Sequence, residues 1–172
     1  MDIPREIRHG EEFALETLKT YLSENNINAD DLSIKQFPSG YSNLTYFLKS
    51  SSHEFVLRRP PFGAKSLQGG HDMFREYNVL KNLKSQFSKV PDVYLYCDNN
   101  EIIGAPFYLM ERVEGYIIRP NLQQKDSPGK EVIQNVSQSL VSTLVELHNV
   151  DINQANLNDL GNIKGYVKRQ VE

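Results

Sequence analysis

The 172-residue sequence predicts an α+β fold in which a five-stranded antiparallel sheet carries one helix between its third and fourth strands. Short runs of alternating apolar and polar residues, separated by turn-forming residues, predict the sheet. An apolar stripe with helical spacing over residues 72–87 predicts the helix. We expect three parts: an N-terminal helical brace over 1–30, a sheet-bearing lobe over 31–115, and the beginning of a helical lobe over 116–172.

Composition and charge narrow the possible classes of function. The sequence is 39% apolar and 24% charged, as is usual for a soluble globular protein. Its net charge of -3 provides no broad positive surface, so nucleic acid is not an expected partner. A charged N-terminus and the lack of a long apolar run argue against a signal peptide and a membrane span. With Cys97 as its single cysteine and no zinc-ligand spacing among its histidines, the protein is expected to be cytoplasmic.

The first predicted helix covers residues 8–24 and is amphipathic, as expected of a helix that packs on a larger body. Its apolar residues are Phe13, Leu15, Leu18, Tyr21 and Leu22. A turn follows, and Leu32 and Ile34 mark the first strand. Asp30 and Asp31 could be read as paired catalytic carboxylates, but Asp is common at turns, and we assign them no chemistry.

A turn with one glycine after the first strand is the first candidate binding feature. It contains Ser39, Gly40, Ser42 and Asn43, and small or polar residues of this kind let hydrogen-bond donors approach an anion such as phosphate. A turn with one glycine is also common in an ordinary antiparallel meander. On this segment alone, both interpretations stay open.

Two strands joined by a hairpin follow the turn, over residues 44–48 and 55–59. Side chains alternate between the two faces of a strand, so Val56 and Arg58 lie on one face and Arg59 lies on the other. Only one of the two arginines can therefore face the turn. If it is Arg58, then Val56 provides an apolar floor on which a flat base could rest.

The helix predicted over residues 72–87 places an acidic residue in its apolar stripe. At about 100° per residue, Glu76 lies at the centre of that stripe. The stripe consists of Met73, Val79, Leu80, Leu83 and Phe87. A buried carboxylate needs a cation, and Arg58 or Arg59 at the end of the preceding strand is the candidate. Such a pair positions nucleotide phosphates in kinases, whereas a Glu76 displaced to the helix rim would simply be solvated.

Two further strands complete the predicted sheet. Residues 90–97 form the fourth strand, which ends at a turn over 98–100. Residues 106–115 form the fifth, which is apolar as far as Met110 and then polar up to its closing glycine. This pattern predicts a buried strand that leads into an exposed linker.

The region after the sheet is predicted to be helical. Ser127 and Pro128 are typical of a helix N-cap and first helical position. We expect the helix that follows to be a core helix, because its apolar residues share one face. They are Ile133, Val136, Leu140, Leu144 and Leu147. A last helical pattern begins at Tyr166 and has no C-cap residue before Glu172. We therefore expect this helix to be incomplete at Glu172.

Five motifs occur in a fixed order from about residue 30 to the end of the chain. They are Phe-Pro-Ser-Gly-Tyr-Ser-Asn-Leu-Thr at 37–45, Phe-Val-Leu-Arg-Arg-Pro-Pro at 55–61, Phe-Arg-Glu-Tyr-Asn-Val-Leu at 74–80, Phe-Tyr-Leu-Met-Glu-Arg-Val-Glu-Gly at 107–115 and Leu-Val-Glu-Leu-His-Asn-Val-Asp at 144–151. Together they resemble the aminoglycoside phosphotransferase family, and more narrowly the branch that is fused to some acyl-CoA dehydrogenases. This resemblance implies the small lobe of a protein-kinase-like fold, followed by the first helix of the large lobe.

The resemblance also implies an activity, which is the transfer of phosphate from ATP, with Mg²⁺, to a hydroxylated small molecule. It implies that Gly40, Ser42 and Asn43 cover the nucleotide phosphates. Arg58 would stand where the fold usually has lysine, with Glu76 as its helix partner. Arginine departs from the family pattern, because its planar fork favours bidentate pairing over the action of a point charge.

The adenine would lie at the end of the fifth strand. The resemblance implies that Met110 is the gatekeeper residue behind the base. The carbonyl of Glu111 and the amide of Val113 would form the hinge hydrogen bonds to its edge. Val56 would then contact one face of the base.

The catalytic motifs of the family are missing from these 172 residues. Phosphoryl transfer needs an aspartate to orient the acceptor and further ligands for Mg²⁺. His148 and Asp151 imitate the family's His-Gly-Asp motif, but their spacing is wrong, so we expect the catalytic half beyond Glu172. Three hypotheses about function stay open: a small-molecule kinase, a non-catalytic nucleotide-binding or regulatory module, and an α+β interaction domain without a ligand.

Overall fold

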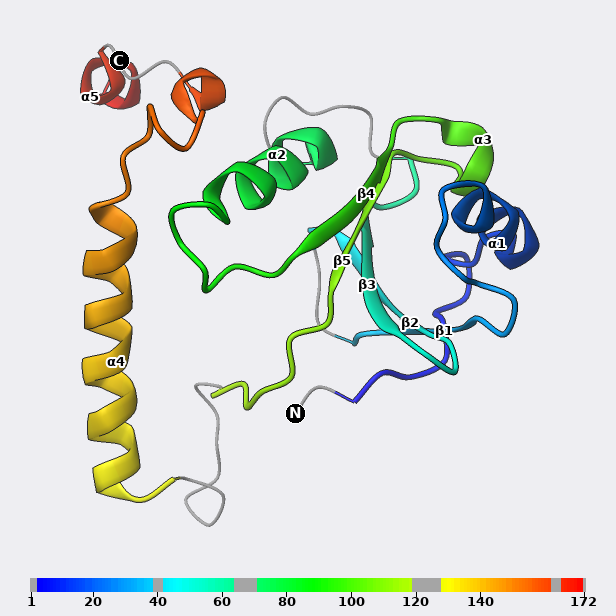
Figure 1. Ribbon diagram of the computed structural model, residues 1–172, viewed down its shortest axis with the longest axis horizontal. Helices are drawn as coiled ribbons and strands as arrows, with labels where there is room; N and C mark the ends of the chain where they lie inside the picture. The colour runs from blue at the N-terminus through cyan, green and yellow to red at the C-terminus, as the bar shows by residue number, and fades with distance from the viewer. Residues whose placement is uncertain (1–2, 39–41, 64–70, 119–127, 162–164, 172) are drawn as a thin grey trace. The chain divides into compact units, whose positions relative to one another are not determined.

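The computed structural model describes residues 3–38, 42–63, 71–118, 128–161 and 165–171. The chain divides into two compact units, the first formed by residues 1–81 and 91–115 and the second by 82–90 and 116–172. The elements are α1 (Leu15–Glu24), β1 (Ser33–Gln36), β2 (Leu44–Lys49), β3 (Glu54–Arg59), α2 (Met73–Leu83), β4 (Val93–Cys97), α3 (Asn100–Ile103), β5 (Phe107–Glu111), α4 (Lys130–His148), the 3₁₀ turn η2 (Asn158–Leu160) and α5 (Tyr166–Val171) (Figure 1).

The first unit is built on a five-stranded sheet with the strand order β1-β2-β3-β5-β4. Every pair of neighbouring strands is antiparallel, and α2 lies between the third and fourth strands of the sequence. The predicted sheet and its helix are thus confirmed, although α2 ends at Leu83 rather than at residue 87 and β5 ends at Glu111 rather than at residue 115. The strand β5 inserts between β3 and β4, so β3, which carries both arginines, is the central strand.

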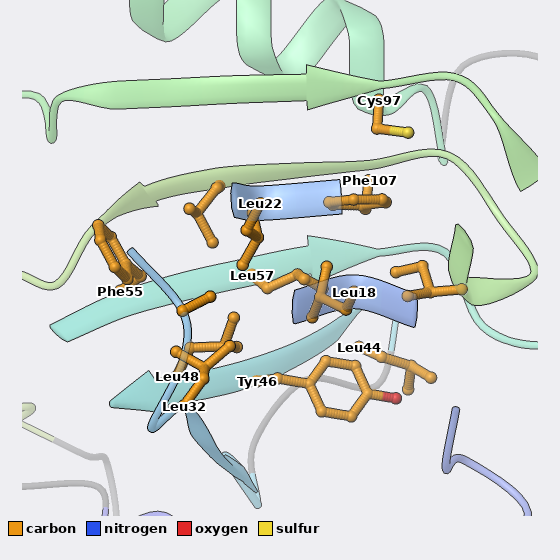
Figure 2. Packing of buried hydrophobic residues seen from close by; sticks show 13 residues of the cluster. Leu18, Leu22, Leu32, Leu44, Tyr46, Leu48, Phe55, Leu57, Cys97 and Phe107 are labelled. Atoms are coloured by element: carbon orange, nitrogen blue, oxygen red, sulfur yellow. The ribbon is translucent and has the colours of Figure 1, made fainter. Parts of the chain in front are cut away.

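One face of the sheet packs against α1 and forms the main hydrophobic core (Figure 2). Leu18 and Leu22 of α1 are fully buried against apolar side chains from β2, β3 and β5. These strand residues include Leu44, Tyr46, Leu48, Phe55, Leu57, Phe107 and Leu109. They follow the period of two that strand geometry requires, which leaves the alternate positions for the opposite face.

The N-terminal helix is shorter than the sequence predicts, because α1 begins at Leu15 rather than at residue 8. The preceding segment pairs with the sheet instead: the backbone groups of Arg5 and Gln36 exchange two hydrogen bonds of 2.8 Å. A turn at Gly10, whose φ is +85°, then redirects the chain. A helix beginning at residue 8 is incompatible with that positive φ, which glycine adopts easily.

The turn predicted over residues 98–100 is in part a short helix, α3. Asn99 caps its N-terminus by accepting a hydrogen bond from the amide of Glu101 at 2.9 Å. Gly104 closes the helix in the left-handed conformation. Asparagine before a helix and glycine after it are ordinary capping signals, so the sequence contained the information for this element.

The second unit contains α4, whose cap and environment differ from the predictions. The N-cap is Gly129, not Ser127, which lies outside the described residues. The expected core position is also wrong, because Leu140 is 59% exposed and Val136 and Leu144 are also exposed. An amphipathic stripe shows that a helix is able to bury one face but does not supply the covering element. Within this unit, Lys89 contacts Glu146 on α4.

The C-terminal helical pattern is confirmed as α5, which the structure describes up to Val171. Among the residues that the structure describes, no helix combines the length and apolar character needed to cross a membrane.

Candidate functional site

The candidate site begins with the face of the sheet that lies opposite the α1 core. In the β3–β5 ladder, Val56 pairs with Met110 and Arg58 pairs with Tyr108. Residues that pair directly across antiparallel strands project from the same face. This face therefore combines the predicted apolar floor, the predicted gatekeeper and the predicted cation.

The structure decides between the two arginines of β3. Arg59 is fully buried on the core side, where its Nη1 donates to the carbonyl of Ile103 at 2.6 Å and its Nε donates to the carbonyl of Pro60 at 3.1 Å. Its guanidinium also lies 3.7 Å from the centre of the Phe62 ring. Burial lowers the pKa of Arg59, because the charged form loses its hydration there. Arg59 therefore links the end of β3 to the C-terminal end of α3.

Arg58 faces Glu76 of α2, with Nε of the arginine 3.2 Å from Oε2 of the glutamate. Both side chains are about one third exposed, at 31% and 33%. Glu76 is therefore neither deeply buried nor left to solvent at the helix rim. The Nε atom of Arg58 makes no hydrogen bond to the residues that the structure describes, so the attraction between the two groups is mainly coulombic.

Two neutral donors hold the carboxylate of Glu76. The hydroxyl of Tyr108 donates to Oε2 at 2.9 Å, and Nδ2 of Asn43 donates to Oε1 at 2.8 Å. Burial raises the pKa of Tyr108, and the charge of Glu76 acts in the same direction against the opposing effect of Arg58. The phenol therefore stays protonated and keeps donating. Both oxygens of Glu76 are thus fixed before any ligand arrives.

The residues of the predicted phosphate turn take different positions. Gly40 lies outside the described residues, and Ser42 is exposed. Asn43 is 4% exposed and its side chain is turned toward Glu76 of α2. Nδ1 of His71, which precedes α2, lies 2.7 Å from its Oδ1. The phosphate-covering role of all three residues stays a prediction.

A pocket of about 530 Å³ opens between α2 and this face of the sheet. It is lined by Arg58, Asp72, Arg75, Glu76, Val79, Leu80, Pro91, Tyr108 and Met110. Cationic and acidic side chains thus line it together with an apolar wall. Sequence reasoning missed Tyr108, although its place two residues before Met110 puts it on the same face of β5.

The predicted hinge follows β5 directly. The amide of Glu111 donates to the carbonyl of Asp92 at 2.8 Å, and Val113 lies outside any helix or strand and is 69% exposed. Between them, Arg112 pairs with Glu54 at the start of β3 and lies over the Phe47 ring at 4.4 Å. Arg112 therefore fastens this segment to the sheet. The hinge contacts of Glu111 and Val113 themselves stay predictions.

A metal site is not evident in the parts of the chain that the structure describes, which contain no group of three or more His, Cys, Asp or Glu residues able to hold an ion. The donors of the described site suit an anionic ligand instead. Arg58 and Arg75 both line the pocket. The Nε atom of Arg58 is itself buried beside Glu76 and makes no hydrogen bond to the described residues.

A strand arginine paired with a helix glutamate, on a five-stranded antiparallel sheet with one intervening helix, defines the small lobe of a kinase-like phosphotransferase. Residues 33–172 match the sequence model of the phosphotransferase enzyme family, and the chain belongs to that family. Its fold is similar to a crystal structure of a Ralstonia eutropha protein assigned to the aminoglycoside phosphotransferases. The TM-score is 0.74 and the identity 27%, over 93% of this chain and 45% of that chain.

Curated relatives confirm the narrower resemblance. Acyl-CoA dehydrogenase family member 11 of rat is 38% identical over 99% of this chain and 23% of the relative. The chicken protein of the same name is 36% identical over 83% of this chain and 18% of the relative. The chain therefore spans less than a quarter of the length of these relatives.

Proposed function

We propose that this chain supplies the nucleotide-binding part of an ATP-dependent small-molecule kinase. The observation that carries the proposal is the contact between Arg58 of β3 and Glu76 of α2, with Val56 and Met110 on the same face of the sheet. A cation in this position is suited to hold phosphate oxygens, while the apolar residues beside it suit a flat base. The family match supports the reaction class.

In this proposal, ATP and Mg²⁺ supply the phosphoryl group and the charge neutralisation that its transfer needs. The chain's own residues bind and orient the nucleotide. Glu76 keeps Arg58 on the ligand side of the sheet, and the planar guanidinium presents two parallel donors to one phosphate. Ser42, together with Gly40 and Asn43 at the start of β2, would cover the phosphates from the other side.

The base would lie against Val56, with Met110 behind it. The carbonyl of Glu111 and the amide of Val113 would then bond its edge. Arg112 supports this role, because its contacts with Glu54 and Phe47 fix the backbone between the two hinge residues. Preorganised backbone of this kind lowers the entropy cost of binding.

The acceptor is proposed only as a hydroxylated small molecule. The 172 residues contain no His-Gly-Asp motif of the kind that orients an acceptor in this family. The alternative proposal is a nucleotide-binding or regulatory module without catalysis. Sequencing the gene past codon 172 separates the two, because a kinase requires the aspartate and the metal ligands. The proposed compartment is the cytoplasm, in keeping with the sequence.

Isothermal titration calorimetry with ATP and Mg²⁺ tests the nucleotide site directly, and thermal stabilisation by millimolar ATP gives a second readout. We expect Arg58→Ala to weaken ATP binding by about tenfold or more, since a charge-assisted hydrogen bond is lost. Lys35→Ala, which removes an exposed cation of β1, is the matched control and is expected to bind like wild type. A folded wild-type protein that neither binds ATP nor gains stability from it would refute the proposal.

A further inference from the structure

Two segments far apart in the sequence meet beside the candidate site through Asn43 and His71. Nδ1 of His71 lies 2.7 Å from Oδ1 of Asn43, and Nδ2 of Asn43 donates to Oε1 of Glu76 at 2.8 Å. Asn43 is 4% exposed, so its amide depends on these partners rather than on bulk water. The three side chains form a continuous hydrogen-bonded series that leads to the carboxylate facing Arg58.

The direction of each hydrogen bond follows from the chemistry of the groups. An ionised carboxylate only accepts, so the amide nitrogen of Asn43 faces Glu76 and its oxygen faces His71. An amide oxygen also only accepts, so Nδ1 of His71 carries the proton. This arrangement holds whether the imidazole is neutral or charged, because Nδ1 donates in both forms.

We propose that Asn43 and His71 are positioning residues for Glu76, and through Glu76 for Arg58. Asn43 fixes the direction of the carboxylate, and His71 fixes the direction of the Asn43 amide. The inference rests on the proposed function, because it gives Asn43 and His71 a part in presenting Arg58 to nucleotide phosphates. Asn43 thus acts through the helix glutamate, in addition to any contact that the backbone of its turn makes with the phosphates.

The contacts on the other oxygen of Glu76 explain how Asn43 and His71 affect Arg58. Tyr108 donates to Oε2, the same oxygen that lies 3.2 Å from Nε of Arg58. Since Asn43 and Tyr108 already satisfy the two oxygens, Glu76 attracts Arg58 without accepting a hydrogen bond from its buried Nε. In the proposed complex, this attraction holds the guanidinium in place while its Nη atoms bond a phosphate.

The test compares ATP with adenosine, which has the base but no phosphates. Asn43→Asp places a second carboxylate against Glu76, and we expect it to weaken ATP binding by about tenfold or more while adenosine binding changes by less than about twofold. Asn99→Asp is the matched control. It adds the same charge but keeps the oxygen that caps α3, and it is expected to bind both ligands like wild type.

Variants of the half-buried His71 provide a second, independent arm. The amide nitrogen of asparagine can stand in for Nδ1, so His71→Asn is expected to keep wild-type ATP affinity. His71→Ala is expected to weaken it by about fivefold. His9→Ala, at an exposed turn, is the control. The His71 variants test the positioning role by themselves if Asn43→Asp does not fold.

The imidazole nitrogen NMR spectrum of His71 tests the hydrogen-bonded series without any nucleotide. A proton on Nδ1 in wild type is expected, whereas a neutral ring protonated only on Nε2 would overturn the inference whatever the protein binds. Equal losses of ATP and adenosine affinity in the variants would also overturn it, because they would indicate a purely structural role. A wild-type protein that has the Nδ1 proton on His71 but does not bind ATP would instead refute the proposed function. It would also refute the role of Asn43 and His71 in ATP binding.

Discussion

Arg58 and Tyr108 stand opposite each other in the β3–β5 ladder, and both approach the same oxygen of Glu76. One brings a full positive charge and the other a neutral hydroxyl. The hydroxyl makes the hydrogen bond, and the arginine contributes the coulombic attraction. A directional bond and a coulombic attraction at this carboxylate therefore add to the apolar and aromatic contacts that hold α2 on this face of the sheet.

Tyr108→Phe is the mildest test of this arrangement. It removes one hydroxyl from a buried ring, and we expect the free energy of unfolding to fall by about 1 kcal/mol, the usual net value of such a hydrogen bond. Urea unfolding monitored by circular dichroism measures the change. Tyr116→Phe, on a side chain that is 90% exposed, is the control and should leave stability unchanged. A Tyr108→Phe protein as stable as wild type would show that this bond has no net effect.

Glu76→Ala removes the acceptor of both neutral donors and the partner of Arg58. We expect a loss of about 1 to 2 kcal/mol in urea unfolding. The larger cost of a buried unpaired charge does not apply, because about a third of the Arg58 side chain is in contact with solvent. Glu16→Ala breaks a comparable ion pair with Lys19 at the surface and should cost less than about 0.5 kcal/mol. Equal effects of the two changes would contradict the role of Glu76.

Strand alternation was sufficient to predict that Arg58 and Arg59 lie on opposite faces, but not which of them faces α2. That choice depends on the pairing of β3 with β5, which brings Tyr108 and Met110 beside Arg58. The partner strand is more than 40 residues away in sequence, and a single-sequence pattern contains no register between such segments. The pairing of Glu76 with one of the two arginines could be predicted; the choice between them could not.

The contacts of Asn43 show a second limit. Its place in a polar turn indicated phosphate binding, whereas its side chain bonds Glu76 and His71. Hydrogen bonds between distant segments depend on tertiary packing and leave no periodic signal. By contrast, the capping residues Asn99 and Gly104 of α3 were readable, because caps act within one turn of the chain.

Arg59 offers a test of the core side of the sheet. Arg59→Ala should lower the free energy of unfolding by about 3 kcal/mol or more, because it opens a cavity and leaves the carbonyl of Ile103 without its donor. Arg59→Met keeps most of the volume and removes a buried cation, so we expect it to cost about 1 kcal/mol. Urea unfolding of both variants separates packing from hydrogen bonding. Losses of equal size would mean that the bonds to Ile103 and Pro60 dominate.

The acid sensitivity of the fold should depend on Glu54, which pairs with Lys49 at 2.8 Å and with Arg112 of the hinge segment. The Lys49 ammonium and the Arg112 guanidinium hold the pKa of Glu54 below its ordinary value of 4.5. A carboxyl with a lowered folded-state pKa contributes stability that is fully present above the unfolded-state value and is lost as the pH falls through the folded-state value. Stability should therefore decrease as the pH drops below 4.5.

Glu54→Gln should flatten that decrease, because glutamine does not titrate and its contacts with Lys49 and Arg112 lack the charge. Urea unfolding at a series of pH values from about 6 down to about 3 measures the slope, which reports the difference in bound protons between the unfolded and folded states. Glu24→Gln, at the exposed end of α1, is the control and should keep the wild-type slope. An unchanged slope in Glu54→Gln would mean that other carboxylates, such as Asp31 with its bond to Ser51, govern the acid response.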